Sequence, residues 1–157
     1  MATIVFVLTF AAALGAALMG GFFYAFSGLV MPSLSRRPPP EAVAAMQTIN
    51  VVVLNPLFFV LFFGPAALGV ALSALAPFVL PAGQATAAFV ASLLYAVGSI
   101  GVTIAKNIPL NDELAAASAE SGEGAAVWTR YLRDWTWWNH ARATACVLSA
   151  GFFVLAL

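Results

Sequence analysis

The sequence has very little charge for its length of 157 residues. Asp, Glu, Lys and Arg make up 8% of it, whereas hydrophobic residues make up 63%. A typical soluble domain is about 25% charged, so this composition predicts an integral membrane protein. The formal net charge is zero, which gives no support for a polyanion partner and argues against nucleic acid.

Cysteine, histidine and clustered carboxylates are also scarce. Cys146 is the only cysteine, so neither an internal disulfide nor a CxxC redox pair can form. One histidine, His140, cannot provide an intrachain bis-histidine haem. A carboxylate-bridged di-iron site needs about four carboxylates and two histidines, which six scattered acidic residues and one histidine do not supply. We therefore expect no metal and no cofactor.

Charges and prolines divide the chain into four apolar segments. No charge occurs before Arg36, between Glu41 and Lys106, or after Arg142. The charge-free N-terminal run is too long for a signal peptide, so we expect a retained helix. Since a membrane span needs about 20 apolar residues, the sequence predicts an all-α, four-transmembrane-helix bundle. It forms one domain over residues 1–157, with spans near 3–31, 45–75, 85–106 and 134–157.

Helices 2 and 4 of this bundle are expected to extend beyond the membrane on the side of loops 1 and 3, which follow the first and third spans. The second helix should run from Glu41 to near Leu75, with kinks at Pro56 and Pro65. The third should stop at 107–111, before a short amphipathic piece over 112–121. The last helix should begin near Ala125.

The basic residues predict the orientation in the membrane. Four spans place loops 1 and 3 on one side, and this side holds every Lys and Arg, with Arg142 at its boundary. The positive-inside rule then puts loops 1 and 3 in the cytoplasm and both termini outside. The expected location is a bacterial inner (plasma) membrane.

Polar residues from every predicted span gather at the same charged end. Trp135, Asn139 and Arg142 follow the i, i+4, i+7 spacing and share one helix face. If Leu157 lies near one membrane face, helix rise puts Arg142 about 22 Å away, at or just inside the opposite boundary, where a charge marks a functional site by default. His140 and Trp138 lie beside them, and the other helices contribute Phe23, Tyr24, Ser27, Gln47, Asn50, Lys106 and Asn107.

Each of these residues also has a structural explanation. Tryptophans form aromatic belts at membrane boundaries, asparagines join helices, and Lys106 could extend its ammonium to the interface. A lone interfacial histidine is more often structural than catalytic. However, more polar residues from several helices gather at this end than the orientation in the membrane requires. Their gathering predicts a polar pocket walled by Phe, Met and Trp.

Several stretches form a distinctive set in order along the chain. They are Gly21–Ser27 with Val30-Met31-Pro32, Met46-Gln47 with Ile49-Asn50 and Asn55-Pro56, Asn107–Asn111, and Trp128 followed by Trp135–Arg142. Together they resemble the anthrone oxygenase family of membrane proteins, also called the DUF1772 proteins. Members often carry threonine after the arginine, where this chain has Ala143. The resemblance implies oxidation of an anthrone-type polyphenol to a quinone with O2, without an obvious cofactor.

A cofactor-independent oxygenase depends on a substrate that donates its own electrons after losing a proton. The protein supplies a base, oxyanion donors and a dry pocket. His140 is the candidate base, because imidazole exchanges protons near neutral pH; Arg142 and Lys106 are candidates to stabilise the anion. Asn50, Asn107 and Asn139 would bind substrate oxygens. Further contacts would come from Ser27 and Gln47, and ring stacking from Phe23, Tyr24, Trp135 and Trp138.

Two other classes of function fit the same pocket. A membrane binding or transport protein could hold a quinone, small aromatic molecule or lipid head group without catalysis, and with four spans it would need a homo-oligomer. An assembly protein could use the polar cluster only to join helices. A haem shared between subunits through His140 also stays open. The expected partners of the enzyme are the lipid bilayer, a small aromatic substrate and O2.

Overall fold

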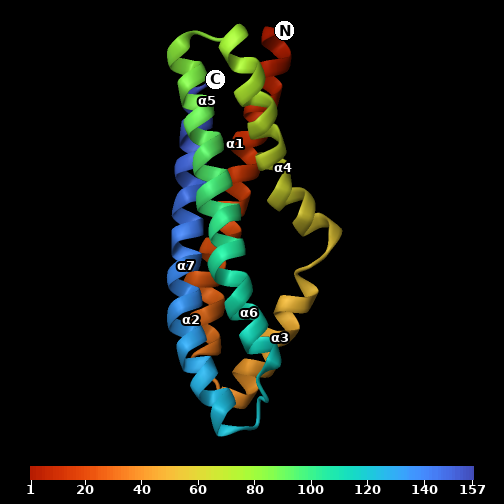
Figure 1. The fold of residues 1–157 in the computed structure, drawn as a ribbon, viewed down its shortest axis with the longest axis vertical. Coiled ribbons are helices and arrows are strands. Elements are labelled where there is room, and N and C mark those ends of the chain that lie inside the picture. Colours follow the sequence, from red (N-terminus) through yellow and green to blue (C-terminus); the bar gives the residue numbers. More distant parts are fainter.

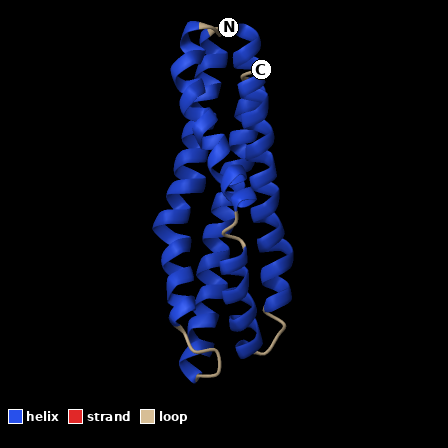
Figure 2. Cartoon of the chain, turned by 90° about the vertical axis from the view of Figure 1, so that its right-hand side faces the viewer, coloured by secondary structure: helices blue, strands red, loops and turns tan.

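The computed structural model describes all 157 residues, and the chain is 89% helical with no strand. Long helices run side by side along the molecule, and both termini lie at the same end as the turn between α4 and α5 (Figure 1). The loops over residues 35–38 and 117–121 lie at the opposite end, as both views show (Figures 1 and 2). We call these the terminal end and the loop end.

Three continuous helical stretches are long and apolar enough to cross a membrane, as an integral membrane protein requires. They run over Ala2–Leu34, Pro56–Phe78 and Ala82–Ala116. The first comprises α1 (Ala2–Ala25), the π-helix η1 (Phe26–Val30) and α2 (Met31–Leu34). The second is α4 (Pro56–Leu75) with a 3-10 turn, η2 (Ala76–Phe78).

The third stretch contains α5 (Ala82–Tyr95), the π-helices η3 (Ala96–Gly101) and η4 (Thr103–Asn107), and α6 (Ile108–Ala116). The last helix, α7 (Gly122–Leu155), is not among the span candidates. A fourth span in its apolar C-terminal half stays a prediction. Helix α7 packs against α1 and α5, and α4 packs against the same two helices.

The buried apolar side chains form two main clusters, one toward each end. The terminal-side core comprises Val5, Ala12, Ala13, Ala16, Met19, Phe23, Phe62, Leu72, Ala91, Tyr95, Ala143, Cys146 and Phe153. The loop-side core comprises Met31, Ala42, Val43, Met46, Leu114, Trp128, Tyr131 and Trp135. Small residues let the helices approach closely around α5: a Cβ at Gly98 would overlap the Cβ of Ala145, and one at Gly69 would lie 2.9 Å from Ser92 Oγ.

The predicted continuous second helix is wrong, because the chain forms two helices, α3 (Pro39–Val52) and α4. Between them Asn55 is extended, and its Oδ1 accepts a hydrogen bond from Phe58 N at 3.1 Å. The residue before a proline disfavours helical geometry, and asparagine is a strong N-cap, so the helix ends here instead of kinking. Figure 1 shows the chain bowing away from the other helices at this break.

The predicted stop at 107–111 is also wrong, because helical structure continues to Ala116. Pro109 lies in the first turn of α6, where its missing N–H costs least. The π-helices η1 and η4 lie next to the residues that gather around Arg142. Each π turn shifts the register of the side chains beyond it, and such turns are frequent at functional sites.

Candidate functional site around Arg142

Arg142 is the only charged side chain that the fold buries, with 5% of its surface exposed. Its Nη1 donates to Thr103 Oγ1 at 3.0 Å, and its Nη2 donates to Asn139 Oδ1 at 2.6 Å. None of the three ion pairs in the chain includes Arg142, and its Nε has no partner. Because an unpaired buried charge is costly, this guanidinium marks a candidate binding site for an anion.

Two aromatic rings hold the guanidinium in place. Its central carbon lies 4.2 Å from the ring centroid of Phe23 and 5.2 Å from that of Trp135. Cation–π attraction at these distances offsets part of the lost hydration. It leaves the net positive charge in place, since neither ring carries a negative charge.

Asn139 fixes the direction of Arg142. Its side chain is fully buried, and its Nδ2 donates to the carbonyl of Phe23 and to Ser27 Oγ, both at 2.6 Å. Its Oδ1 accepts the bond from Arg142. The amide therefore ties α7 to α1 and η1, and it acts as a positioning residue because its polar atoms are already engaged. Trp135, Asn139 and Arg142 are all buried, in line with their predicted common face.

A cavity of about 480 Å³ extends from Arg142 to the break between α3 and α4. Its walls are mostly apolar, with eight aromatic side chains: Phe22, Phe23, Phe26, Phe58, Phe59, Phe62, Phe63 and Trp135. Phe58 and Phe62 stack with ring centroids 5.4 Å apart. The polar lining consists of Gln47, Asn50, Thr103, Asn111, Asp112 and Arg142. This combination suits a flat, largely apolar ligand with a few polar groups.

Tyr131 lies behind the loop end of this cavity. Its hydroxyl donates to Asn111 Oδ1 at 2.9 Å and accepts from Asn50 Nδ2 at 3.4 Å. Its ring stacks on those of Trp128 and Trp135, with centroids 5.8 and 5.7 Å away. Burial raises the pKa of Tyr131 well above its ordinary value, so the hydroxyl stays protonated.

Gln47 lines the cavity, but its amide hydrogen-bonds to the C-terminal end of α6. Its Nε2 donates to the carbonyls of Leu114 and Ala117 at 2.8 and 3.0 Å. These carbonyls lie at the C-terminal end of α6, where few backbone N–H groups remain to pair with them, and that of Leu114 also accepts from Ala117 N at 3.2 Å. Asn107 is buried as well, but it donates to the carbonyl of Trp135 at 3.3 Å and does not line the cavity.

Seven predicted site residues do not line the cavity: Ser27, Asn107 and Asn139 are buried beside it, and His140, Tyr24, Lys106 and Trp138 lie farther out. His140 is exposed, because it follows Asn139 by one position and a helix turns about 100° per residue. Tyr24 is 68% exposed, while Phe23 and Ser27 face inward in its place. Lys106 is exposed, with its Nζ 5.0 Å from the ring centroid of Trp138. This placement argues against His140 as the base, Lys106 as an anion partner, and Tyr24 or Trp138 as stacking groups.

The structure adds Thr103, Asn111, Asp112 and Tyr131 to the site. Thr103 stands out in the sequence as a polar residue near the charged end, but nothing there pairs it with Arg142. Asn111 falls in a stretch predicted to stop a helix, and Asp112 begins the amphipathic piece predicted after it, so their place on a cavity wall is not evident. No group of three or more His, Cys, Asp or Glu side chains is close enough to hold a metal.

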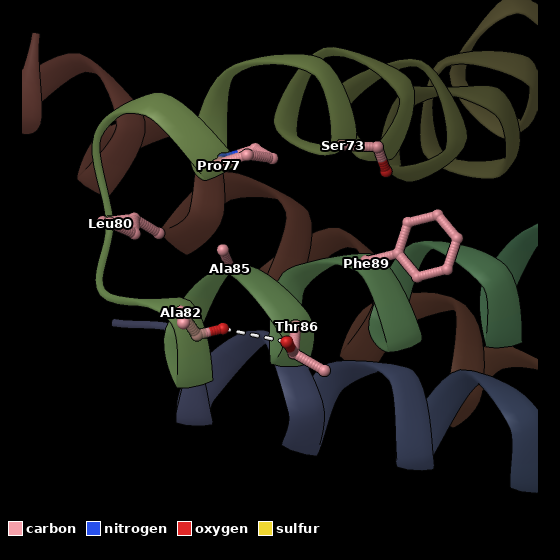
Figure 3. Close-up of a pocket in the computed structure, with 7 residues that line it drawn as sticks. All are labelled: Ser73, Pro77, Leu80, Ala82, Ala85, Thr86 and Phe89. Atoms are coloured by element: carbon pink, nitrogen blue, oxygen red, sulfur yellow. Dashed lines mark hydrogen bonds between the residues drawn. The ribbon is translucent and has the colours of Figure 1, made fainter.

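A second hollow, of about 410 Å³, lies at the terminal end between α4 and α5. It is lined by Ser73, Pro77, Leu80, Ala82, Ala85, Thr86 and Phe89 (Figure 3). None of these side chains is ionisable, and the Thr86 hydroxyl donates to the carbonyl of Ala82 at 2.8 Å. This hollow therefore offers little chemistry, and the cavity beside Arg142 is the candidate site.

Comparison with known proteins identifies the family of the chain. A search of curated proteins finds no match, and neither does a search of solved structures. The model of the anthrone oxygenase family matches residues 58–152. The matched region includes the 107–111 stretch and Trp128–Arg142, but not the motifs before residue 58. Because the match covers more than half of the chain, the protein belongs to the anthrone oxygenase family.

Proposed function

We propose that this chain is a membrane oxygenase that converts an anthrone-type polyphenol to a quinone with O2 in the cavity beside Arg142. The observation that carries the proposal is a buried guanidinium that lines an aromatic cavity and has no carboxylate partner. The deprotonated anthrone is a flat anion with charge on its ring oxygen. This anion would supply the negative charge that Arg142 lacks as a partner, and its flat rings could pack against the aromatic walls.

The proposed reaction balances without a further reductant. The methylene carbon of the anthrone loses a proton, and the resulting anion gives two electrons to O2 as a carbon–oxygen bond forms. The hydroperoxide produced then loses water across its oxygen–oxygen bond. One oxygen atom of O2 becomes the new carbonyl, and the other leaves as water.

Arg142 would stabilise the enolate oxygen through its charge and its free Nε–H, as oxyanion donors do. Asn139 and Thr103 would hold the guanidinium in direction, and the phenylalanines would exclude water from the reacting carbon. We assign the base to Asp112, the only carboxylate among the cavity-lining residues. Asp112 takes the role predicted for His140 from the sequence.

The proposed membrane arrangement has four spans, with the C-terminal half of α7 as the fourth. It is supported by the packing of α7 against α1 and α5 and by the position of both termini at one end. The loop end, which carries the exposed Lys and Arg residues, would face the cytoplasm of a bacterial inner membrane. A phosphatase fused to Leu157 should be active outside the cytoplasm, and an inactive fusion would reverse this topology.

The test is oxygen uptake by detergent-purified protein given emodin anthrone, with quinone formation followed by absorbance. We expect uptake above the spontaneous rate, one quinone per O2, and its loss in Arg142→Gln and in Asp112→Asn. His140→Ala is the matched control and should stay active. Tight binding of the anthrone without any uptake would instead support the binding or transport alternative.

A further inference from the structure

The cavity has two polar ends, and the proposed chemistry gives no role to Asn50 or Asn111 at the second of them. Arg142 and Thr103 form the first end. Asn50 and Asn111 belong to the second, where both hydrogen-bond to the hydroxyl of Tyr131. On α7, helix rise separates Tyr131 from Arg142 by about 16 Å, and Trp135 lies between them.

The hydroxyl of Tyr131 determines which amide atoms remain available. It takes one N–H of Asn50 and gives its own hydrogen to Asn111 Oδ1. The carbonyl oxygen of Asn50 and the amide nitrogen of Asn111 make no hydrogen bond with the protein, although both residues line the cavity. Sharing one hydroxyl also keeps the two amides side by side. The second end therefore presents a free acceptor next to free N–H donors.

A donor beside an acceptor matches a ligand group that has both properties. A phenolic hydroxyl accepts one hydrogen bond and donates another, whereas a methoxy group or a bare ring carbon cannot do both. The walls between the two ends are aromatic, so the part of the ligand between its polar groups must be flat and apolar.

We propose that Asn50 and Asn111, oriented by Tyr131, are specificity-determining residues that select a ligand with a phenolic hydroxyl on the ring farthest from Arg142. This inference rests on the proposed function, because it assumes that the enolate end of the ligand lies at Arg142. Tyr131 is a positioning residue in this arrangement, since it does not itself line the cavity.

The experiment measures binding without oxygen, so that no turnover is needed. Anthrone and 2-hydroxyanthrone are titrated under argon into the full-length protein, with quenching of tryptophan fluorescence as the signal, because Trp135 lines the cavity. The wild type should bind the hydroxylated probe about tenfold more tightly, the strength of one or two net hydrogen bonds. In Tyr131→Phe and Asn111→Leu this ratio should fall toward one.

Tyr95→Phe is the control for Tyr131→Phe. It removes a buried hydroxyl that bonds to the carbonyl of Phe62 at 2.9 Å, in the terminal-side core. Its binding ratio should equal that of the wild type. Circular dichroism confirms folding, and the ratio between two probes cancels any general loss of affinity.

The possible results separate the inference from the proposed reaction. A ratio that collapses in both variants supports the inference, even if no oxygen is consumed when air is admitted. Equal ratios in the wild type, Tyr131→Phe and Asn111→Leu overturn it, even if the protein is an active oxygenase. Failure of the wild type to bind either probe overturns both.

Discussion

The terminal-side core and the surroundings of Arg142 differ in how many of their buried polar groups have partners, although Ser99 Oγ, beside Tyr95, also lacks one. In the terminal-side region, Ser149 Oγ donates to the carbonyl of Ala91 at 2.8 Å and Tyr95 donates to that of Phe62 at 2.9 Å. Around Arg142, the guanidinium Nε, Trp135 Nε1 and Asn107 Oδ1 are buried without partners.

The presence or absence of a hydrogen-bond partner distinguishes buried polar groups that join helices from those available to a ligand. A buried polar group that donates to a carbonyl of a neighbouring helix joins the two helices and needs no further hydrogen-bond partner. An unsatisfied one costs about 1–3 kcal/mol, so the unpartnered Nε of an unpaired buried guanidinium on a cavity wall fits a site that a ligand completes. Substitutions in the two regions should therefore affect different quantities: stability in the first, and activity in the second.

The largest effect is expected from Arg142→Gln. Removal of the cation should lower kcat/KM for an anthrone by about 100-fold or more, the usual loss for an oxyanion donor. The melting temperature should equal or exceed that of the wild type, because an uncompensated buried charge disappears. Oxygen uptake and thermal unfolding in one preparation measure both. A lower melting temperature with full activity per folded molecule would show that Arg142 is structural.

A smaller loss of activity is expected from Asn139→Ala. It removes the amide that accepts from Arg142 Nη2 and donates to the carbonyl of Phe23 and to Ser27 Oγ. We expect about a tenfold lower kcat, since misplaced catalytic groups lose rate. Ser27→Ala serves as the milder comparison, because the bond from Asn139 to the carbonyl of Phe23 remains. Steady-state kinetics with both variants give the order; equal rates in wild type and Asn139→Ala would contradict the positioning role.

In the terminal-side region, Gly98→Ala should lower stability by about 1–3 kcal/mol, the usual cost of overpacking. A Cβ at this position overlaps that of Ala145, whereas one at Gly64 meets nothing within 4 Å. Gly64→Ala is therefore the matched control and should leave stability unchanged or slightly higher. Unfolding in detergent measures both, and equal stabilities of the two variants would show that the close approach of η3 and α7 is unimportant.

The smallest effect is expected from His140→Ala, which should leave kcat/KM within about twofold of the wild type, as surface substitutions usually change little. The imidazole is exposed on the side of α7 away from Arg142. Oxygen uptake across neutral pH measures this. A large loss in the folded variant would restore His140 as the base and remove that role from Asp112.

Part of the fold is evident from the sequence, and part depends on local geometry. Charge distribution and apolar length predict the all-α membrane protein and the common end of loops 1 and 3. The break at Asn55-Pro56 and the helix that continues through Pro109 depend on how single residues satisfy their backbone groups. A proline can end a helix, kink it or lie in its first turn, and the spacing of apolar residues does not predict which of these occurs.

The site was predictable where polar residues recur at helical spacing beside a charged residue. Trp135, Asn139 and Arg142 share such a face, and the structure buries all three. The first helix gives no such pattern, because its lipid-facing side is as apolar as its inner side. The choice between Tyr24 and Phe23 as the inward residue was therefore undetermined, and the π turns at η1 and η4 changed the register further.

The most direct test of the Arg142 cavity as the ligand site is photochemical labelling with a flat aromatic ketone such as anthraquinone, mapped by mass spectrometry. Labels should fall on the cavity walls in α1, α4 and α7, among Phe22, Phe26, Phe58, Phe62 and Trp135, and excess emodin should suppress them. Labels confined to the terminal-end hollow, around Pro77 and Phe89, would contradict the assignment of the site.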